Sequence, residues 1–264
     1  MCIRDSTLTS IKINDHESFL LIGGYRGNQS SKLDVWEYSF EKTWRTLNTT
    51  GHAPNIFGHS TVFHAATLTL YIFGGYEMSD KIRISKKLFS LSYQKESQTW
   101  RWSNLPPFKE LNRPEEKLPR PRYLHSAIAF SQYMIIYGGD PTNTSDLLNA
   151  YVYKCNSWIR LTEGATDIIG KSLEQSFMQA VAIENDSDMN NFYVVGGFDG
   201  PFTISKISIP TDLCQLWSNS KYMCRLNRGC SFGQISVNNT KSSFCFSTDQ
   251  KDQKKNDLSS FNPG

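Results

Sequence analysis

The chain has 264 residues, of which 39% are hydrophobic and 13% aromatic, and its formal net charge at neutral pH is +3. This length accommodates one large domain and a small appendage. The net charge is too small to predict a nucleic acid as the partner of the whole chain, and no apolar run is long enough to span a bilayer.

Residues 1–6, MCIRDS, share no feature with the sequence that follows them. They are interpreted as a non-native leader left by sequence assembly or expression. The repeat-like sequence therefore starts at residue 7.

Four Gly-Gly pairs, each at the end of a short apolar run, divide the chain from residue 7 to residue 210. They recur about 50 to 65 residues apart, which is the spacing of a repeat architecture. Each pair follows β-branched and aromatic residues, so each marks the end of a strand at a backbone conformation that favours glycine. The predicted scaffold glycines are Gly23, Gly24, Gly74, Gly75, Gly138, Gly139, Gly196 and Gly197.

The same order of elements surrounds each glycine pair. A strand precedes the pair, and in two copies it begins with His-Ser, at His59 and His125. A strand ending in tyrosine follows, and after a short turn tryptophan opens a last strand, at Trp44, Trp100 and Trp158. Four short strands per copy predict antiparallel hairpins, and such sheets repeated radially form a β-propeller. The histidines and tryptophans are predicted to be scaffold, with the three tryptophans repeat-equivalent and buried between sheets.

This order of elements resembles the kelch repeat over roughly residues 7–209. The stretch PRPRYLHSA at 119–127, with the later cysteine cluster, resembles more narrowly the attractin and multiple-EGF-like-domain family of extracellular proteins. The resemblance implies an all-β fold, a kelch-type β-propeller followed by a cysteine-rich PSI module. Kelch propellers usually have six or seven blades, so about four visible blades imply an incomplete six-bladed propeller. The blades are expected at about 7–48, 55–106, 121–163 and 175–210, the last without a convincing outer strand.

Four of the six cysteines lie in the short polar segment 211–247. Such a segment cannot bury enough apolar surface to be stable alone, so disulfides are favoured. Zinc is the alternative, but the spacing lacks the close cysteine pair of structural zinc sites. The expected disulfide-bonded residues are Cys214, Cys224, Cys230 and Cys245, in a PSI-like module separate from the blades, with the pairing left open. Cys155 is expected to be a free thiol, and residues 248–264 to be a disordered tail.

Five Asn-x-Ser/Thr sequons occur where the repeat places loops. Together with the cysteine cluster they favour the secretory pathway, hence an extracellular protein or the ectodomain of a membrane protein. The predicted glycosylation sites are Asn28, Asn48, Asn143, Asn185 and Asn238.

The sequence contains no recognisable catalytic motif. The chain has no nucleophile elbow, P-loop or His-Glu-x-x-His motif. His59 and His64 lie five residues apart on a predicted strand, so they point to opposite faces and do not form a metal site. No catalytic residue, cofactor or metal is predicted, and the chain is interpreted as a non-enzyme.

A binding function remains, and two inserted loops of the second copy, 77–87 and 106–122, are rich in cations. We expect them to project from one side of the propeller and to attract an acidic protein or a sulfated glycan, although an ordinary solvated surface is the alternative. Arg122 is expected instead to start an inner strand. The candidate binding residues are Lys81, Arg83, Lys86, Lys87, Arg113, Lys117 and Arg120.

Two classes of function stay open. The favoured one is an extracellular, non-catalytic protein-protein interaction module that binds its partner through propeller loops. The alternative is an intracellular kelch adaptor, which presents substrates to a ubiquitin ligase or tethers the cytoskeleton. Reduced cysteines and an absence of glycan would favour the adaptor. The partner itself is not readable from the sequence, because propellers host many functions.

Overall fold

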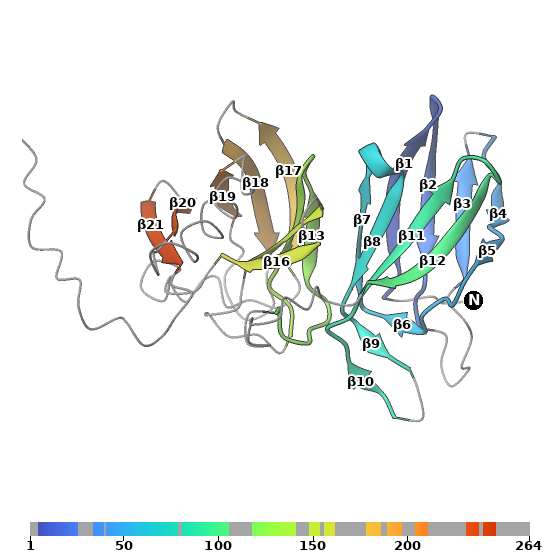
Figure 1. Cartoon of the computed structure of the whole chain (residues 1–264), viewed down its shortest axis with the longest axis horizontal. Coiled ribbons are helices and arrows are strands. Elements are labelled where there is room, and N and C mark those ends of the chain that lie inside the picture. The colour runs from blue at the N-terminus through green and yellow to red at the C-terminus, as the bar shows by residue number, and fades with distance from the viewer. Residues whose placement is uncertain are drawn as a thin grey trace, which may run out of the picture.

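The computed structural model describes residues 5–25, 34–39, 41–78, 81–105, 118–140, 148–153, 156–161, 178–185, 189–196, 204–210, 231–237 and 240–246. In this part of the chain the regular structure is mostly β-strand, with a 3-10 turn at Ala65–Thr67. Four larger sheets lie side by side in chain order (Figure 1). The predicted all-β fold, with about four blades of a propeller, is confirmed.

The first three blades are built from antiparallel neighbours in chain order, as hairpin-forming sequence predicts. The first blade contains β1 (Thr7–Ile13), β2 (His16–Ile22), β3 (Val35–Ser39) and β4 (Trp44–Thr46). The second contains β7 (Ser60–His64), β8 (Thr69–Phe73), β11 (Leu88–Gln94) and β12 (Thr99–Leu105). The third contains β13 (Ser126–Ala129), β14 (Tyr133–Tyr137), β15 (Leu148–Val152) and β16 (Ser157–Arg160).

The connection from the first to the second blade adds a short extra strand. This strand, β5 (Thr49–Thr50), pairs in parallel with β12 at the outer edge of the second blade. Thr49 Oγ1 accepts a hydrogen bond of 3.2 Å from the Trp102 indole, and Thr50 Oγ1 donates one of 3.3 Å to the Trp100 carbonyl. The edge of β12 is therefore covered by the chain itself.

The fourth blade contains β17 (Met178–Asn185), β18 (Met189–Gly196) and β19 (Ile204–Pro210), followed by β20 (Ser231–Val237) and β21 (Thr240–Phe246). Two residue pairs join β20 to β19, so its outer strands come from residues 231–246. This differs from the expectation of a module separate from the blades. β20 and β21 pair with each other in antiparallel fashion over seven residues each, so β21 joins the same sheet. The disulfide-bonded module itself stays a prediction.

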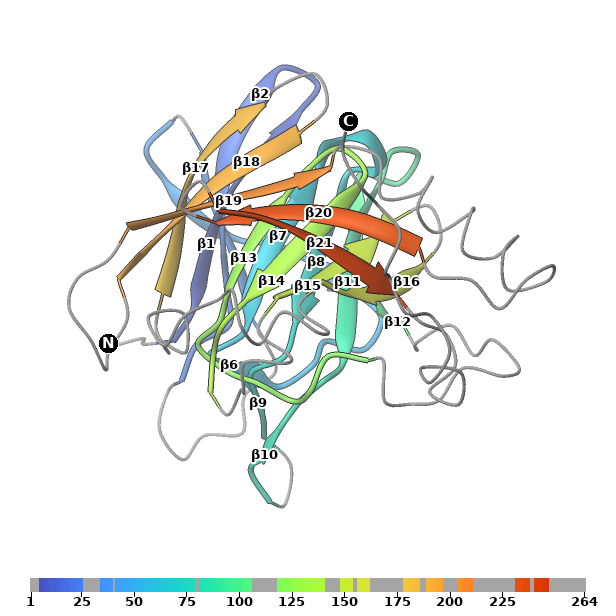
Figure 2. The same ribbon diagram turned by 90° about the vertical axis from the view of Figure 1, so that its left-hand side faces the viewer.

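The first strands of successive blades lie next to one another. Contacts join β1 to β7, β7 to β13 and β13 to β17, so these strands form the inner ends of the four blades. The view along the row shows the sheets fanned behind one another, with β17–β21 in front (Figure 2). This radial order of inner strands is the arrangement of a β-propeller.

Apolar side chains fill the spaces between the blades. The first and second blades meet through residues such as Ile11, Leu20, Ile22, Ile72, Leu91 and Trp102. The second and third meet through Val62, Phe73, Leu88, Met134, Ile136 and Trp158. Each blade therefore depends on its neighbours for burial of its faces, as in other repeat architectures.

Two of the three predicted scaffold tryptophans are buried as expected, since Trp100 is 5% and Trp158 9% exposed. The prediction for Trp44 was wrong, because this side chain is 49% exposed. A tryptophan at this repeat position packs against the blade that precedes its own. None of the described residues covers the face of the first blade on which Trp44 lies. The predicted equivalence of Trp44, Trp100 and Trp158 was also wrong. Trp44 and Trp158 occupy the same position in the outer strands of their blades, but in the second blade that position belongs to Trp102 and not to Trp100.

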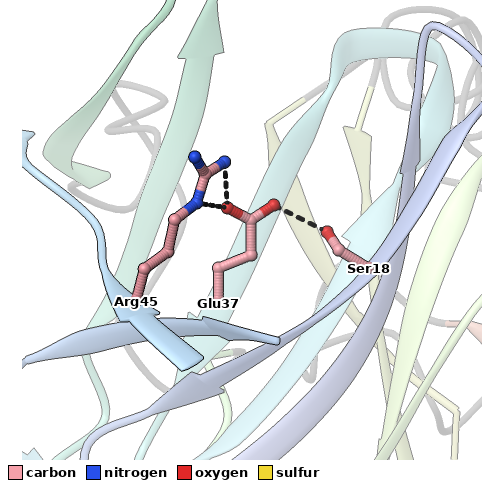
Figure 3. A network of polar contacts seen from close by, with 3 residues as sticks. All are labelled: Ser18, Glu37 and Arg45. Carbon is pink, nitrogen blue, oxygen red and sulfur yellow. Dashed lines mark hydrogen bonds and ion pairs between the residues drawn. The ribbon is translucent and has the colours of Figure 1, made fainter. Parts of the chain in front are cut away.

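A polar network holds the outer strands of the first blade together (Figure 3). Ser18 Oγ donates to Glu37 Oε1 at 2.9 Å, and the Arg45 guanidinium approaches Glu37 Oε2 from Nε at 2.7 Å and Nη2 at 2.6 Å. Glu37 is only 14% exposed whereas Arg45 is 68% exposed. The network satisfies a largely buried carboxylate, so Arg45 has a structural role.

Candidate protein-interaction face

A small three-stranded sheet projects from one end of the blades. Strands β9 (Tyr76–Glu77) and β10 (Arg83–Ile84) form a hairpin in the connection between β8 and β11. Strand β6 (Ile56–Phe57), which precedes the second blade, pairs with the other side of β9. In both views β9 and β10 extend below the four sheets (Figures 1 and 2). We call this end, with residues 25, 55–58, 76–78, 81–87 and 118–124, the loop face.

Half-buried aromatic rings from three blades form a continuous row on the loop face. Tyr25 lies 5.0 Å from Phe57, Phe57 lies 5.0 Å from Tyr76, and Tyr76 lies 4.2 Å from Tyr123, measured between ring centroids. Tyr123 Oη donates to Asp140 Oδ2 at 2.6 Å. This hydrogen bond, followed by one involving Tyr76, raises the pKa of Tyr123 above its usual value. The phenol therefore stays protonated and holds the row against the third blade.

In the second and third blades the glycine pair allows the backbone that follows the second strand to approach closely the backbone that precedes the first strand. At Gly75, with φ of +82°, a Cβ atom would lie 2.5 Å from the Phe57 carbonyl oxygen. At the equivalent Gly139, with φ of +94°, it would lie 2.9 Å from the Tyr123 carbonyl oxygen. These carbonyls belong to aromatic residues of the row, so the predicted scaffold glycines position the loop face.

Exposed cations lie in the connection that contains this hairpin and in the connection that follows the second blade. Lys81, Arg83, Lys86, Lys87 and Arg120 are all exposed. Lys87 Nζ forms an ion pair of 2.6 Å with Glu77, and Arg83 lies directly opposite Glu77 in the β9–β10 register.

The described end of the second basic loop reaches the base of this hairpin. The Arg122 backbone N–H donates to the Ser85 carbonyl at 3.2 Å, and the Gly75 N–H donates to the Arg122 carbonyl at 2.8 Å. Candidate residues Arg113 and Lys117 lie outside the described residues, so the shared side of the two loops stays a prediction for 106–117.

Arg122 differs from its neighbours because it is fully buried. Its Nη1 donates to the Gly138 carbonyl at 3.0 Å, and its Nε donates to the Arg120 carbonyl at 3.4 Å. The expectation that Arg122 starts an inner strand was wrong, because β13 begins at Ser126 and Arg122 lies in the connection before it. A guanidinium with these carbonyl acceptors fixes the junction between the second and third blades.

The two repeat-equivalent histidines join successive blades at their inner ends. His59 Nε2 lies 3.2 Å from Thr7 Oγ1 of the first blade, and His125 Nε2 lies 2.7 Å from Ser60 Oγ of the second. Burial lowers the pKa of His59 to about 4. Burial, and then the charges of Arg122 and His59, hold the pKa of His125 well below 6.5. Both rings are therefore neutral at physiological pH and serve the scaffold.

His64 faces the other way, as the odd separation from His59 predicts. Its Nε2 lies 3.0 Å from the Ser131 carbonyl of the third blade, and its Nδ1 lies 2.8 Å from Thr67 Oγ1. Within the described part of the chain, no group of three or more His, Cys, Asp or Glu side chains could hold a metal ion.

The predicted modification sites are mostly outside the described residues. Asn48 is exposed between β4 and β5, whereas Asn185 is the last residue of β17 and not part of a loop. Asn28, Asn143, Asn238, Cys155, Cys214, Cys224 and Cys230 lie outside the described residues, as does the side chain of Cys245 in β21. Gly197 also lies outside them.

Sequence reasoning missed the aromatic row. Its members precede the His-Ser strand at Phe57 and Tyr123 and follow the glycine pair at Tyr25 and Tyr76. The recurrence of aromatic residues at these two repeat positions was the available signal. The radial arrangement of the blades was needed to show that the two positions meet across blade boundaries.

Comparisons with known proteins agree with the fold. The chain is 30% identical over 205 residues to the rat "Multiple epidermal growth factor-like domains protein 8", covering 75% of this chain and 7% of the relative. It is 26% identical over 274 residues to the human protein of that name, covering 81% of this chain and 9% of the relative. The chain thus spans less than a tenth of the length of these relatives.

A solved structure shares the fold at low sequence identity. "Cryo-EM structure of RAG in complex with one melted RSS and one unmelted RSS" matches with a TM-score of 0.50 and 14% identity, over 80% of this chain and 64% of the other. In the described residues, no helix has the length and apolar character needed to cross a membrane. The family described as "Attractin/LZTR1 beta-propeller" matches residues 1–205, and the chain belongs to this family.

Proposed function

We propose that this chain is a non-catalytic protein-interaction module of an extracellular protein or ectodomain, and that it binds its partner through the loop face. The relatives carry EGF-like domains in their names, which supports an extracellular parent protein. The propeller family supports an interaction module. The predicted disulfides and glycans belong to the same proposal, and the intracellular adaptor is the alternative that the experiments distinguish.

The observation that carries the proposal is the combination of aromatic and cationic side chains on one face. Tyr76 and Tyr123 are half-buried, so their rings are held in place while part of their surface stays accessible. Rigid aromatic side chains and arginine are enriched at the centres of protein interfaces. The flanking cations would steer an acidic partner toward this face.

A binding experiment with a matched charge control tests the proposal. The chain is secreted from mammalian cells, tetramerised through a tag, and applied to a panel of adherent cell lines. The loop-face variant K81S/R83S/K86S should lose most binding. The control variant K12S/K42S/K95S removes the same charge from hairpins at the opposite end of the blades and should bind like the unmodified chain.

Enzymatic treatment of the cells identifies the class of partner. Trypsin should abolish binding, because the partner is a protein, and heparinase should leave it unchanged. Equal losses in the two charge variants would contradict the loop face as the binding surface. Failure of the chain to be secreted, with a folded reduced form in the cytosol, would favour the intracellular adaptor.

A further inference from the structure

One exposed apolar side chain stands apart from the others. Among the described residues, the exposed large hydrophobic side chains are Leu8, Phe19, Trp44 and Ile82. The first three lie on the uncovered face of the first blade. Ile82 lies instead in the β9–β10 hairpin of the loop face, and it is 57% exposed.

The surroundings of Ile82 are cationic. Its sequence neighbours Lys81 and Arg83 are both exposed, and the exposed Lys86 lies two residues beyond the end of β10. Two acids lie in the same connection: Glu77 on β9 pairs with Lys87, and Asp80 directly precedes Lys81 in the sequence, so the four cations of 77–87 outnumber the acids. An exposed apolar side chain therefore lies between two exposed cations in the projecting connection.

We propose that Ile82 is the apolar anchor of the loop face, and that the partner segment it docks on is acidic and carries a large apolar residue. This inference rests on the proposed function and names the chemistry of the partner. The partner's apolar residue covers Ile82 and removes both side chains from water, while its carboxylates lie against Lys81, Arg83 and Lys86. Neighbouring tyrosines of the aromatic row supply further contact surface.

The exposed isoleucine decides between this partner and other polyanions. A sulfated glycan offers anionic groups but no large apolar side chain, so Ile82 would contribute nothing to its binding. A lipid surface would accept Ile82, but a single small apolar group gives only weak membrane attachment. The combination of one apolar anchor with several cations fits a protein segment best.

Three fluorescent synthetic peptides test the proposal. The first contains Glu and Asp around a central Leu-Phe pair, the second replaces its acids by Gln and Asn, and the third replaces Leu-Phe by Ser-Ser. Fluorescence anisotropy should show that the chain binds the first peptide at least tenfold more tightly than either of the others. Added salt should weaken this binding, because it screens the cations.

Point variants locate the anchor. Ile82→Ser should weaken binding of the first peptide by roughly ten- to a hundredfold, and the salt dependence of the binding should be unchanged. The K81S/R83S variant should reduce the salt dependence. Leu8→Ser is the matched control, since it also removes an exposed apolar side chain, and it should bind like the unmodified chain. Thermal unfolding should be unchanged in all three, because the replaced side chains are exposed.

Several results would overturn the inference. Equal affinity for the first and third peptides would show that charge alone binds. Tighter binding to a heparin fragment, or to phosphatidylserine vesicles, than to the first peptide would assign the site to a glycan or to a membrane. In the cell assay, normal binding by Ile82→Ser together with loss in K81S/R83S/K86S would refute the anchor while the proposed function stands. Loss in neither variant would refute both.

Discussion

Gly58 and Gly75 both have left-handed backbone conformations, with φ of +64° and +82°, but their surroundings differ. A Cβ at Gly58 would have no neighbour closer than 3.7 Å, whereas at Gly75 it would lie 2.5 Å from the Phe57 carbonyl oxygen and 2.9 Å from the His59 nitrogen. Gly58→Ala should therefore lower the free energy of unfolding by about 1 kcal/mol, the cost of the backbone conformation. Gly75→Ala should lower the free energy of unfolding by clearly more, because the backbone between Phe57 and His59 must also move.

Urea unfolding of both variants measures this difference. The comparison holds glycine removal and positive φ constant and changes only the space around the new Cβ. Equal losses of stability would show that the close approach at Gly75 is not needed for the fold.

Trp158 and Trp44 open equivalent strands, but they should contribute very differently to the free energy of unfolding. Trp158→Ala removes a side chain that is 9% exposed and lies 4.9 Å from the Phe73 ring of the neighbouring blade. It should cost about 3–5 kcal/mol. Trp44→Ala removes a side chain that is 49% exposed, so in this chain it should cost clearly less. Denaturant midpoints of the two variants provide the measurement. A larger loss of stability for Trp44→Ala than for Trp158→Ala would contradict the exposed position of Trp44.

At the scale of the elements, the inner strands are joined by histidines that must be neutral. The pKa of His59 is about 4 in the folded chain and near 6.5 in the unfolded chain, and the pKa of His125 is lowered in the same direction. Between these values the unfolded chain binds more protons, so its population rises as the pH falls. Above about pH 6.5 the free energy of unfolding should not depend on these histidines. As the pH falls to about 4.5, protonation of His59 in the unfolded chain should decrease the free energy of unfolding by about 2–3 kcal/mol.

Glutamine tests this pH dependence because its amide can replace the histidine Nε2 contact without titrating. The variant H59Q/H125Q should lose less stability between pH 7 and pH 4.5 than the unmodified chain. The control H16Q/H52Q changes two exposed histidines and should follow the unmodified chain. Parallel pH profiles of stability for H59Q/H125Q and the unmodified chain would refute the role of the buried rings.

At the scale of the whole molecule, the state of the cysteines tests the proposed compartment. Cys214, Cys224, Cys230 and Cys245 should form two disulfides, each stabilising by roughly 2–4 kcal/mol, and Cys155 should stay free. Mass spectrometry of the secreted chain, with and without reduction, should show the loss of four hydrogens in peptides spanning 214–245. Four free thiols there, or a bound zinc ion, would contradict both the disulfides and the extracellular assignment.

Much of the fold could be predicted because each blade is built from local hairpins. Strand signals, polar turns and glycine pairs act over a few residues, and they recur in each copy. Gly74, Gly75, Gly138 and Gly139 all have positive φ, as the interrupted strands predict. The repeated His-Ser start of the inner strand likewise identified His59 and His125 as scaffold, and both are buried. Periodicity alone was enough to derive these features.

The neighbours of a residue across the blade boundaries depended on the tertiary structure. Trp44 and Trp158 open equivalent strands, yet only Trp158 has a described blade against it. Arg120 and Arg122 are two residues apart, yet one is exposed and the other is fully buried on the Gly138 carbonyl. The aromatic row and the pairing of β20 with β19 likewise join distant segments. Local sequence sets the conformation of each blade, but burial and contact between blades arise only when separate sheets pack together.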